Sequence, residues 1–254
     1  MIDIHCHILP GIDDGASNEA ESLAMLQTAV DEGIHTIVAT PHYISKYPTE
    51  KQRILSKVEE LNRVIETNQL PINILPGQEI RAYGELLEDY EAGKLLAIGN
   101  GSRYILLEFS ASHVPRYAEK LLYNMEFQGL KAIIAHPERN AEMMENPDKL
   151  YKLVEKGALT QITAASVIGL FGKKIQAFTH QIIEANLAHV IASDAHNTTS
   201  RGFVMKQAFA KIEGKYGNGC VRYLQENAQL ILENQIIYPE QFEQIKKKKF
   251  LGIF

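Results

Sequence analysis

Seven short apolar runs, separated by longer segments with one polar face, constrain the fold more than any other feature of this sequence. They cover residues 1–5, 35–40, 72–80, 104–109, 131–136, 158–163 and 189–194. Most are continuous aliphatic or β-branched runs such as YILLEF, without the alternation of a sheet that is exposed on one face. Continuous runs are expected where a parallel sheet is covered on both faces. We therefore expect seven buried strands.

The segments between these runs have the pattern of amphipathic helices. In residues 17–33, Ser17 is the predicted N-cap, Leu23, Leu26 and Val30 share a face, and Gly33 marks the end. Further helices are predicted at 49–68, 82–92, 114–128, 147–156, 173–186 and 199–215. Strands that alternate with helices in this way predict an α/β fold, either a barrel or a doubly wound sheet.

No linker, repeat or low-complexity stretch interrupts this alternation before about residue 240. The chain of 254 residues is long for one domain, but α/β barrels often use this length. We expect a single domain over residues 1–240. Residues 241–254 contain the run KKKKFLGIF, and we expect a basic, frayed and disordered tail, although its lysines would also suit an acidic surface or lipid headgroups.

The composition argues against several classes of function. A net charge of −5 disfavours a broad nucleic-acid-binding face. No run of about 18 apolar residues is present to span a bilayer, and the N-terminus lacks the pattern of a signal peptide. The two cysteines are too few for a disulfide scaffold. We expect a cytoplasmic protein with no integral membrane segment and no nucleic-acid partner.

Side chains that commonly bind metal ions follow six of the seven predicted strands. They are His5 and His7 in HCH, His42, Glu79, Glu108, His136, and Asp194 with His196 in SDAH. Residues two apart point to the same side of a strand, so His5 and His7 can approach one ion together. A single histidine at a strand end is more often structural, but coincidence across six strands is a poor explanation. Because the carboxyl ends of barrel strands converge on one mouth, we expect a single site.

Imidazole and carboxylate groups without thiolate suit manganese, iron or zinc. With Asp14 or Asp13 added, about nine candidates exceed what one ion binds, which predicts two or three ions. Such a centre would lower the pKa of bound water and favour an anionic substrate. Arg139 in HPERN and Arg201 in SDAHNTTSR lie just beyond strand ends. We interpret both as phosphate-binding, since a guanidinium can hold two phosphate oxygens, although either alone could be a surface arginine.

Two other kinds of phosphate chemistry are disfavoured by residue spacing. Neither cysteine has an arginine at the sixth position after it, as a cysteine-based tyrosine phosphatase requires: Ile12 stands there after Cys6, and Glu226 after Cys220. The run GLFGKK lacks the GxxxxGK spacing of a nucleotide-binding loop. Cys6 is predicted to be a small packing residue whose side chain points away from its histidine neighbours.

The motifs HCH, IVATPH, GQEI, LLEFS, IIAHPER and VIASDAHN together resemble the polymerase and histidinol phosphatase (PHP) superfamily over almost the whole chain. More narrowly, LPGIDDG, IIAHPERN and IASDAHN look like the manganese-dependent protein-tyrosine phosphatases of Gram-positive capsule and exopolysaccharide operons, close to the Bacillus member. The resemblance implies a distorted seven-stranded (β/α)7 TIM-like barrel, the PHP fold, with a trinuclear metal centre. It also implies a phosphotyrosine protein as partner, expected to be a bacterial tyrosine kinase.

The same resemblance implies a role for each candidate residue. The first ion would be held by His5, His7, Glu79 and Asp194, the second by Glu79, Glu108 and His136, and the third by Asp14, His42 and His196. Asp13 stays open as an alternative to Asp14. Many superfamily members have histidine in place of Glu108 and the early aspartate, and this departure itself resembles the tyrosine-phosphatase branch. Arg139 and Arg201 match the phosphate-binding arginines of that branch.

The resulting hypothesis is that a metal-bridging hydroxide attacks phosphotyrosine directly, with no phosphoenzyme intermediate. The leaving phenolate has a conjugate-acid pKa of about 10, which predicts a preference for aryl phosphates over serine phosphates. Mn²⁺ is the expected ion, with Fe or Zn as alternatives. One alternative function is hydrolysis of histidinol phosphate or another small phosphoester within the same superfamily. An alternative of another class is a non-catalytic metal-binding adaptor for the kinase.

Overall fold

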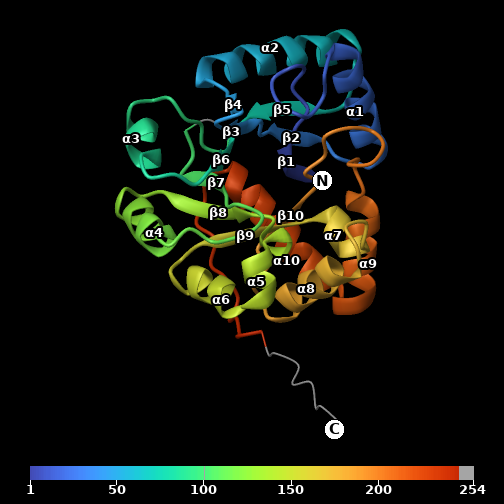
Figure 1. Ribbon diagram of the computed structural model, residues 1–254. Helices are drawn as coiled ribbons and strands as arrows, with labels where there is room; N and C mark the ends of the chain where they lie inside the picture. Colours follow the sequence, from blue (N-terminus) through green and yellow to red (C-terminus); the bar gives the residue numbers. More distant parts are fainter. Residues whose placement is uncertain (100, 246–254) are drawn as a thin grey trace.

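The computed structural model describes residues 1–99 and 101–245, which form a mixed α/β structure with two sheets (Figure 1). The smaller sheet holds the parallel strands β1 (Ile2–Cys6), β2 (Thr36–Ala39) and β5 (Asn73–Pro76) in the order β1-β2-β5. The larger has the order β10-β9-β8-β7-β6-β3-β4, with only β3 and β4 antiparallel. Its strands are β3 (His42–Ile44), β4 (Tyr47–Pro48), β6 (Glu79–Arg81), β7 (Tyr104–Glu108), β8 (Lys131–Ala135), β9 (Leu159–Thr163) and β10 (Val190–Ala192).

We expect a distorted seven-stranded TIM-like barrel, but the described residues form two sheets and no closed barrel. The chain changes sheet just after the strand predicted at 35–40 and within the strand predicted at 72–80. One break falls between β2 and β3 and the other between β5 and β6, so each chain segment leaves the smaller sheet and joins the larger. Pro41 lies at the first break, where it has no amide hydrogen to continue a ladder. Gly77 lies at the second, where a Cβ would be 2.6 Å from Val38. Only glycine allows this close approach.

The inward-facing side chains nevertheless meet in one core. At their carboxyl ends, β1 and β10 are joined by an isolated bridge between Cys6 and Ala195. The core between the strands includes Ile4, Val38, Leu106, Ile133, Leu159 and Val190, packed with Ala228 and Ile231 of α10 (Asn218–Leu232). Asn227 of α10 donates a 2.8 Å hydrogen bond to the carbonyl of His189, just before β10 begins. Helix α10 therefore covers the amino ends of the strands, and the carboxyl ends are left for polar side chains.

The helices surround the two sheets, and each predicted helix is present with shorter bounds. In Figure 1, α1 and α2 lie over the smaller sheet, with α4, α6 and α8 beside the larger one. The predicted helices are α1 (Glu19–Asp31), α2 (Lys51–Thr67), α3 (Leu86–Glu91), α4 (Ala118–Phe127), α6 (Asp148–Glu155), α8 (Lys173–Glu184) and α9 (Met205–Tyr216). Helices that were not predicted are α5 (Ala141–Glu145), α7 (Ala164–Ile168), α10 and the 3₁₀ turn η1 (Pro137–Arg139).

The predicted N-cap of the first helix is wrong by one residue. The side chain of Asn18, not Ser17, accepts a 3.0 Å hydrogen bond from the amide of Glu21. The amide of Ser17 instead donates to the Glu21 carboxylate, which completes a reciprocal cap. On the helix itself, Leu26 is buried as expected, whereas Leu23 and Val30 are only partly buried.

Helices of the described residues include none that is both long and apolar enough to cross a membrane. Of the predicted basic tail, residues 246–254 lie outside the described part of the chain. The preceding residues pack onto the domain: Ile245 is buried, and the Phe242 ring meets the Tyr151 ring edge-on at 5.5 Å.

Candidate metal centre

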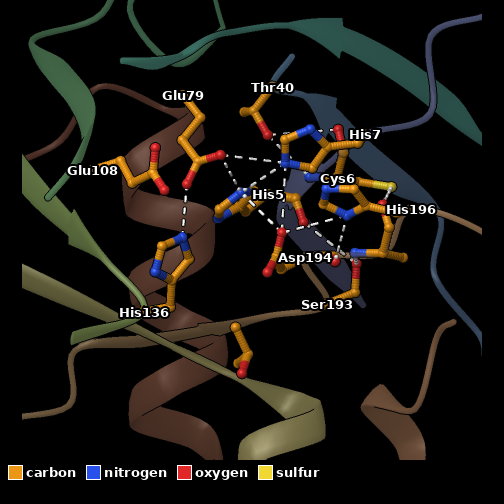
Figure 2. Close-up of polar contacts among 12 residues, drawn as sticks. His5, Cys6, His7, Thr40, Glu79, Glu108, His136, Ser193, Asp194 and His196 are labelled. Atoms are coloured by element: carbon orange, nitrogen blue, oxygen red, sulfur yellow. Dashed lines mark hydrogen bonds and ion pairs between the residues drawn. The ribbon is translucent and has the colours of Figure 1, made fainter. Parts of the chain in front are cut away.

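All nine side chains that the sequence suggested as metal ligands lie in one cluster at the carboxyl ends of β1, β7, β8 and β10 and at the two strand breaks. Figure 2 shows most of them converging from separate strands. The breaks position two of them: His42 opens β3, Glu79 opens β6, and the two residues are register partners across the sheet. The feature that interrupts the barrel therefore places two candidates side by side. The nine are His5, His7, Asp14, His42, Glu79, Glu108, His136, Asp194 and His196.

Glu79 lies at the centre of the cluster and is fully buried. Its Oε1 is 2.7 Å from Nε2 of His136, and its Oε2 is 2.8 Å from Nδ1 of His42. The same Oε2 lies 3.4 Å from Nε2 of His5 and 3.3 Å from Nε2 of His7. Burial alone would raise the pKa of Glu79, but the surrounding imidazoles outweigh it and hold the pKa well below its ordinary value. The carboxylate is thus charged and faces four imidazole rings.

Asp194 faces Glu79 across His5 of β1 and His7, which directly follows β1. Its Oδ1 lies 3.4 Å from Nε2 of both His5 and His7. Its Oδ2 accepts from Arg139 Nη1 at 2.7 Å and from Arg201 Nη2 at 3.1 Å. Burial opposes ionisation, but Arg139 and His5 hold the pKa of Asp194 well below its usual range. Both predicted phosphate-binding arginines therefore reach the edge of the cluster from different elements.

The backbone at Asp194 and His136 is left-handed, with φ of 52° and 34°. Non-glycine residues adopt this region at a cost, and such residues concentrate at functional sites. Around Asp194 the turn is fixed by a buried network in which Asp3 accepts from the amide and hydroxyl of Ser193. The Asp194 amide also donates to the carbonyl of His5 at 2.8 Å. These bonds hold the carboxylate toward the cluster.

The two neighbouring aspartates, which the sequence did not distinguish, have different positions. Oδ1 of Asp14 lies 3.4 Å from Nε2 of His42 and of His196, so its carboxylate faces the cluster. Oδ2 of Asp13 instead accepts from His7 Nδ1 at 2.6 Å and from the amide of His42 at 3.0 Å. Asp13 therefore binds the far side of the His7 ring and leaves Nε2 directed at the cluster. The geometry favours Asp14 as the candidate ligand and gives Asp13 an orienting contact.

Sequence reasoning missed two further polar contacts to the cluster. Arg81 Nε donates to Glu108 Oε2 at 2.9 Å, and Gln161 Oε1 is 2.8 Å from His5 Nδ1. Both had a detectable signal in the sequence. Arg81 is two residues after Glu79 and so shares its side of the strand, while Gln161 is a polar residue inside an apolar run. Burial and the nearby Glu79 raise the pKa of Glu108, which Arg81 partly offsets.

The donor atoms fit divalent cations that prefer nitrogen and oxygen ligands. Buried Nδ1 of His42, Oε2 of Glu79 and Nε2 of His196 have no hydrogen-bond partner in residues 1–99 and 101–245, although the first two atoms lie only 2.8 Å apart. Buried polar atoms that converge without bonding to each other are expected where an ion is shared. Burial, together with a nearby cation, lowers the pKa of His136 and of His196 to about 4, so both rings are neutral and able to coordinate at pH 7.

The described residues contain four overlapping sets of possible metal ligands. Within each set, the ligand atoms all lie within 4.8 Å of one another. They are His7, Asp14, His42 and His196; His5, Glu79 and His136; His5, His7 and Asp194; and His42, Glu79 and Glu108. A cavity of about 340 Å³ opens beside these sets and is lined by His42, Glu108, His136, Arg139, Asp194 and Arg201. The cluster is therefore accessible from solvent on the side where the two arginines lie.

Comparison with known proteins identifies the family of the chain. The model of the CpsB/CapC family, described as capsular polysaccharide synthesis, matches residues 1–233. The chain belongs to the CpsB/CapC family. The resemblance drawn from HCH, HPERN and SDAHN is thereby confirmed.

Members of the CpsB/CapC family from other bacteria are similar over nearly their full length. The chain is 47% identical to the tyrosine-protein phosphatase YwqE of Bacillus subtilis, over all of both chains. It is 40% identical to the putative tyrosine-protein phosphatase CapC of Staphylococcus aureus, again over all of both. It is 32% identical to CpsB of Streptococcus pneumoniae, over 93% of this chain and all of that one.

A solved structure of the family has the same fold. It superimposes with a TM-score of 0.95 at 47% identity, and the match covers 97% of this chain and all of the other. The structure comes from a description of crystal structures of YwqE from Bacillus subtilis and CpsB from Streptococcus pneumoniae as unique metal-dependent tyrosine phosphatases. A lactonase from Listeria monocytogenes shares the fold alone. Its TM-score is 0.51 at 11% identity, and the match covers 97% of this chain and 95% of the lactonase chain.

Proposed function

We propose that this protein is a metal-dependent protein-tyrosine phosphatase. The observation that carries the proposal is the convergence of four overlapping carboxylate-imidazole sets among the described residues with two arginines, Arg139 and Arg201, that meet on Asp194. Such a site offers cation ligands and phosphate-binding groups in one cavity. Relatives that are named tyrosine-protein phosphatases support the choice of substrate class.

We infer that the cluster holds two or three ions, with Mn²⁺ preferred and Fe or Zn as alternatives. Following the family resemblance, the inferred ligands are His5, His7, Glu79 and Asp194 for one ion, Glu79, Glu108 and His136 for a second, and Asp14, His42 and His196 for a third. All nine residues occur in the overlapping groups of donor atoms described above. Bound divalent ions would supply an activated water and offset the charge of the phosphate oxygens. The unpartnered donor atoms of His42, Glu79 and His196 support this assignment.

The protein's own groups would bind and orient the substrate. Arg139 stands 5.5 Å from the ring centre of Phe171, which with Asp194 limits the freedom of its guanidinium. Both arginines can exchange Asp194 for phosphate oxygens in the cavity, where a planar guanidinium matches the phosphate geometry. A phenolate leaves without strong acid assistance because its conjugate acid has a pKa of about 10. The site therefore suits aryl phosphates.

We also propose the finer aspects of the fold and setting. The strand order is interpreted as an opened (β/α)7 barrel in which β2 with β3, and β5 with β6, each represent one broken barrel strand. The domain is inferred to span residues 1–240, and Phe242 and Ile245 of the following segment pack onto it. A bacterial tyrosine kinase of capsule or exopolysaccharide synthesis is the proposed partner, supported by the description of the family. The two free cysteines are in keeping with a cytoplasmic protein.

Metal-stripped protein reconstituted with single metals tests this function. We expect no turnover of a phosphotyrosine peptide until Mn²⁺, Fe²⁺ or Zn²⁺ is added, and then a preference over the matching phosphoserine peptide of about a hundredfold or more, because the phenolate leaves more easily. Full activity of the stripped protein, or equal turnover of phosphoserine, would refute the proposal. Preferred turnover of histidinol phosphate would indicate the small-phosphoester alternative. Kinase binding without hydrolysis at any metal loading would indicate an adaptor.

The two aspartates give a test of the ligand assignment. Replacing Asp14 by Asn is expected to remove one equivalent of bound ion, since its carboxylate faces His42 and His196. Replacing Asp13 by Asn is expected to keep the number of ions but weaken their affinity about 10- to 100-fold, because it loosens the His7 ring. Elemental analysis and metal titration measure both. Loss of an ion from the Asp13 variant alone would reverse the assignment.

A further inference from the structure

A second cavity lies directly against the proposed active site and is larger, at about 870 Å³. Ser110 lines both cavities. Arg81, which also lines the larger one, donates to Glu108 of the metal cluster. We call this cavity the flanking groove; its walls include Arg81, Arg116, Tyr117, Glu142, Lys149 and Lys152. The groove therefore begins where the active-site cavity ends.

The two cavities have sizes that suit different parts of a protein substrate. The 340 Å³ cavity beside the metal cluster is near the lower limit for small-ligand sites, which matches one phosphorylated side chain. The flanking groove is near the upper limit, which leaves space for several residues. A phosphotyrosine that enters the first cavity must leave its neighbouring residues outside it. The flanking groove is the adjoining space that can receive them.

The charge of the flanking groove differs in sign from that of the whole protein. Its lining contains four cations, Arg81, Arg116, Lys149 and Lys152, and three carboxylates, Glu119, Glu142 and Asp148, whereas the chain carries a net charge of −5. Two of these cations are already paired among the described residues, Lys149 with Glu142 at 2.7 Å and Arg81 with Glu108 at 2.9 Å. The cations that remain for a ligand are therefore Arg116 and Lys152, beside the carboxylates Glu119 and Asp148. In the described part of the chain, Arg116 and Lys152 are exposed and form no ion pair.

Helix geometry adds to this positive charge. The first turns of α4 and α6 both line the flanking groove, and a helix N-terminus carries roughly half a positive charge. The remaining two carboxylates, Glu119 and Asp148, lie in these first turns, where the helix ends partly offset their charge. Tyr117 forms an aromatic wall that is fixed by a 3.0 Å hydrogen bond from its hydroxyl to the Ala82 carbonyl. The groove thus combines free cations with a rigid apolar surface.

We propose that the flanking groove binds an acidic polypeptide segment next to the phosphotyrosine of the substrate. This inference rests on the proposed phosphatase function and adds a sequence preference to it. Arg116 and Lys152 supply the charge contacts, and the Tyr117 ring supports the peptide chain. A small aryl phosphate fills only the active-site cavity and does not reach these residues.

The test compares three peptides that share one phosphotyrosine and carry acidic, neutral or basic flanking residues, with para-nitrophenyl phosphate as the small substrate. For the manganese-loaded protein we expect kcat/KM to be about tenfold higher for the acidic than for the basic peptide, through two exposed charge contacts. The effect should lie in KM, since such contacts act equally on ground and transition states. It should also weaken at high salt.

The double variant Arg116→Glu and Lys152→Glu is expected to lose or reverse this preference while its rate on para-nitrophenyl phosphate stays unchanged. The matched control is Lys211→Glu with Arg222→Glu, two exposed cations on α9 and α10 outside the groove. Equal kcat/KM for the three peptides, or an equal loss of para-nitrophenyl phosphate activity in the groove variant, would overturn the inference. If the proposed phosphatase function itself is wrong, the result is different: no phosphotyrosine substrate is hydrolysed at any metal loading.

Discussion

Replacing Glu79 by Gln is expected to lower kcat for phosphotyrosine hydrolysis about a thousandfold or more. The Glu79 carboxylate contacts His136 and His42 at 2.7 and 2.8 Å and lies within 3.4 Å of His5 and His7. In the proposed centre it is shared between two ions, so the loss of one charge affects both. Glutamine keeps the shape of the side chain, which separates the effect of charge from that of packing. Steady-state kinetics and elemental analysis of the same preparation measure the change.

An exposed glutamate on α3 provides the control. Glu88→Gln removes the same charge far from the cluster and should leave kcat and metal content unchanged. The Glu79 variant must also show a cooperative thermal unfolding transition, which establishes that the buried position tolerates glutamine. Retention of both full metal content and more than about a tenth of the wild-type kcat would show that the charge of Glu79 is not required.

Replacing Arg139 by Lys is expected to lower kcat/KM for phosphotyrosine peptides about a hundredfold. Lysine keeps the charge but cannot hold two phosphate oxygens with a planar group. Arg139 is the closer of the two arginines to Asp194, at 2.7 Å against 3.1 Å for Arg201. Its guanidinium also stands over the Phe171 ring, and lysine would stack less well there. The loss should appear for phosphotyrosine and para-nitrophenyl phosphate alike.

Inhibition by inorganic phosphate measures the contact between Arg139 and the phosphate group independently of turnover. The Arg139→Lys variant should require a higher phosphate concentration for half inhibition, while its metal content stays that of the wild type. Arg222→Lys, at an exposed position on α10, serves as the matched control. A variant with unchanged phosphate inhibition and unchanged kcat/KM would exclude Arg139 from phosphate binding.

The candidate ligands could be predicted from the sequence because each follows an apolar run, and the carboxyl ends of parallel strands share one side of the fold. His5, Glu108, His136 and Asp194 illustrate this, since they come from four different strands and meet in one cluster. The pattern depends only on strand position and residue type. It therefore does not require knowledge of how the sheets are joined.

The division of the strands into two sheets could not be predicted from the sequence pattern, because the two breaks depend on local backbone chemistry. Pro41 directly follows the strand that we predict at 35–40, and Gly77 stands within the strand that we predict at 72–80. The close approach of Gly77 to Val38 is a long-range contact that the sequence does not reveal. Helix α10 was missed although its buried residues Val221, Leu224, Ala228 and Ile231 recur at helical spacing, so the sequence does contain its signal.

The choice between Asp13 and Asp14 required coordinates for another reason. Adjacent residues in a turn have similar reach, and only the direction of each side chain separates them. Asp13 is held by the Gly15 and His42 amides and by the His7 ring, whereas Asp14 has no such backbone contact among the described residues and points toward His196. Orientation within a turn is set by such hydrogen bonds and not by residue type.

Cys6, between His5 and His7 at the end of β1, is fully buried and donates its thiol hydrogen to the Ala195 carbonyl. Burial raises the pKa of Cys6 well above its ordinary value, so the thiol stays protonated. Peroxide attacks thiolates that solvent can reach, and Cys6 meets neither condition. The catalysis that we propose uses no thiolate, so peroxide would not inactivate it through Cys6, in contrast to a phosphatase with a cysteine nucleophile.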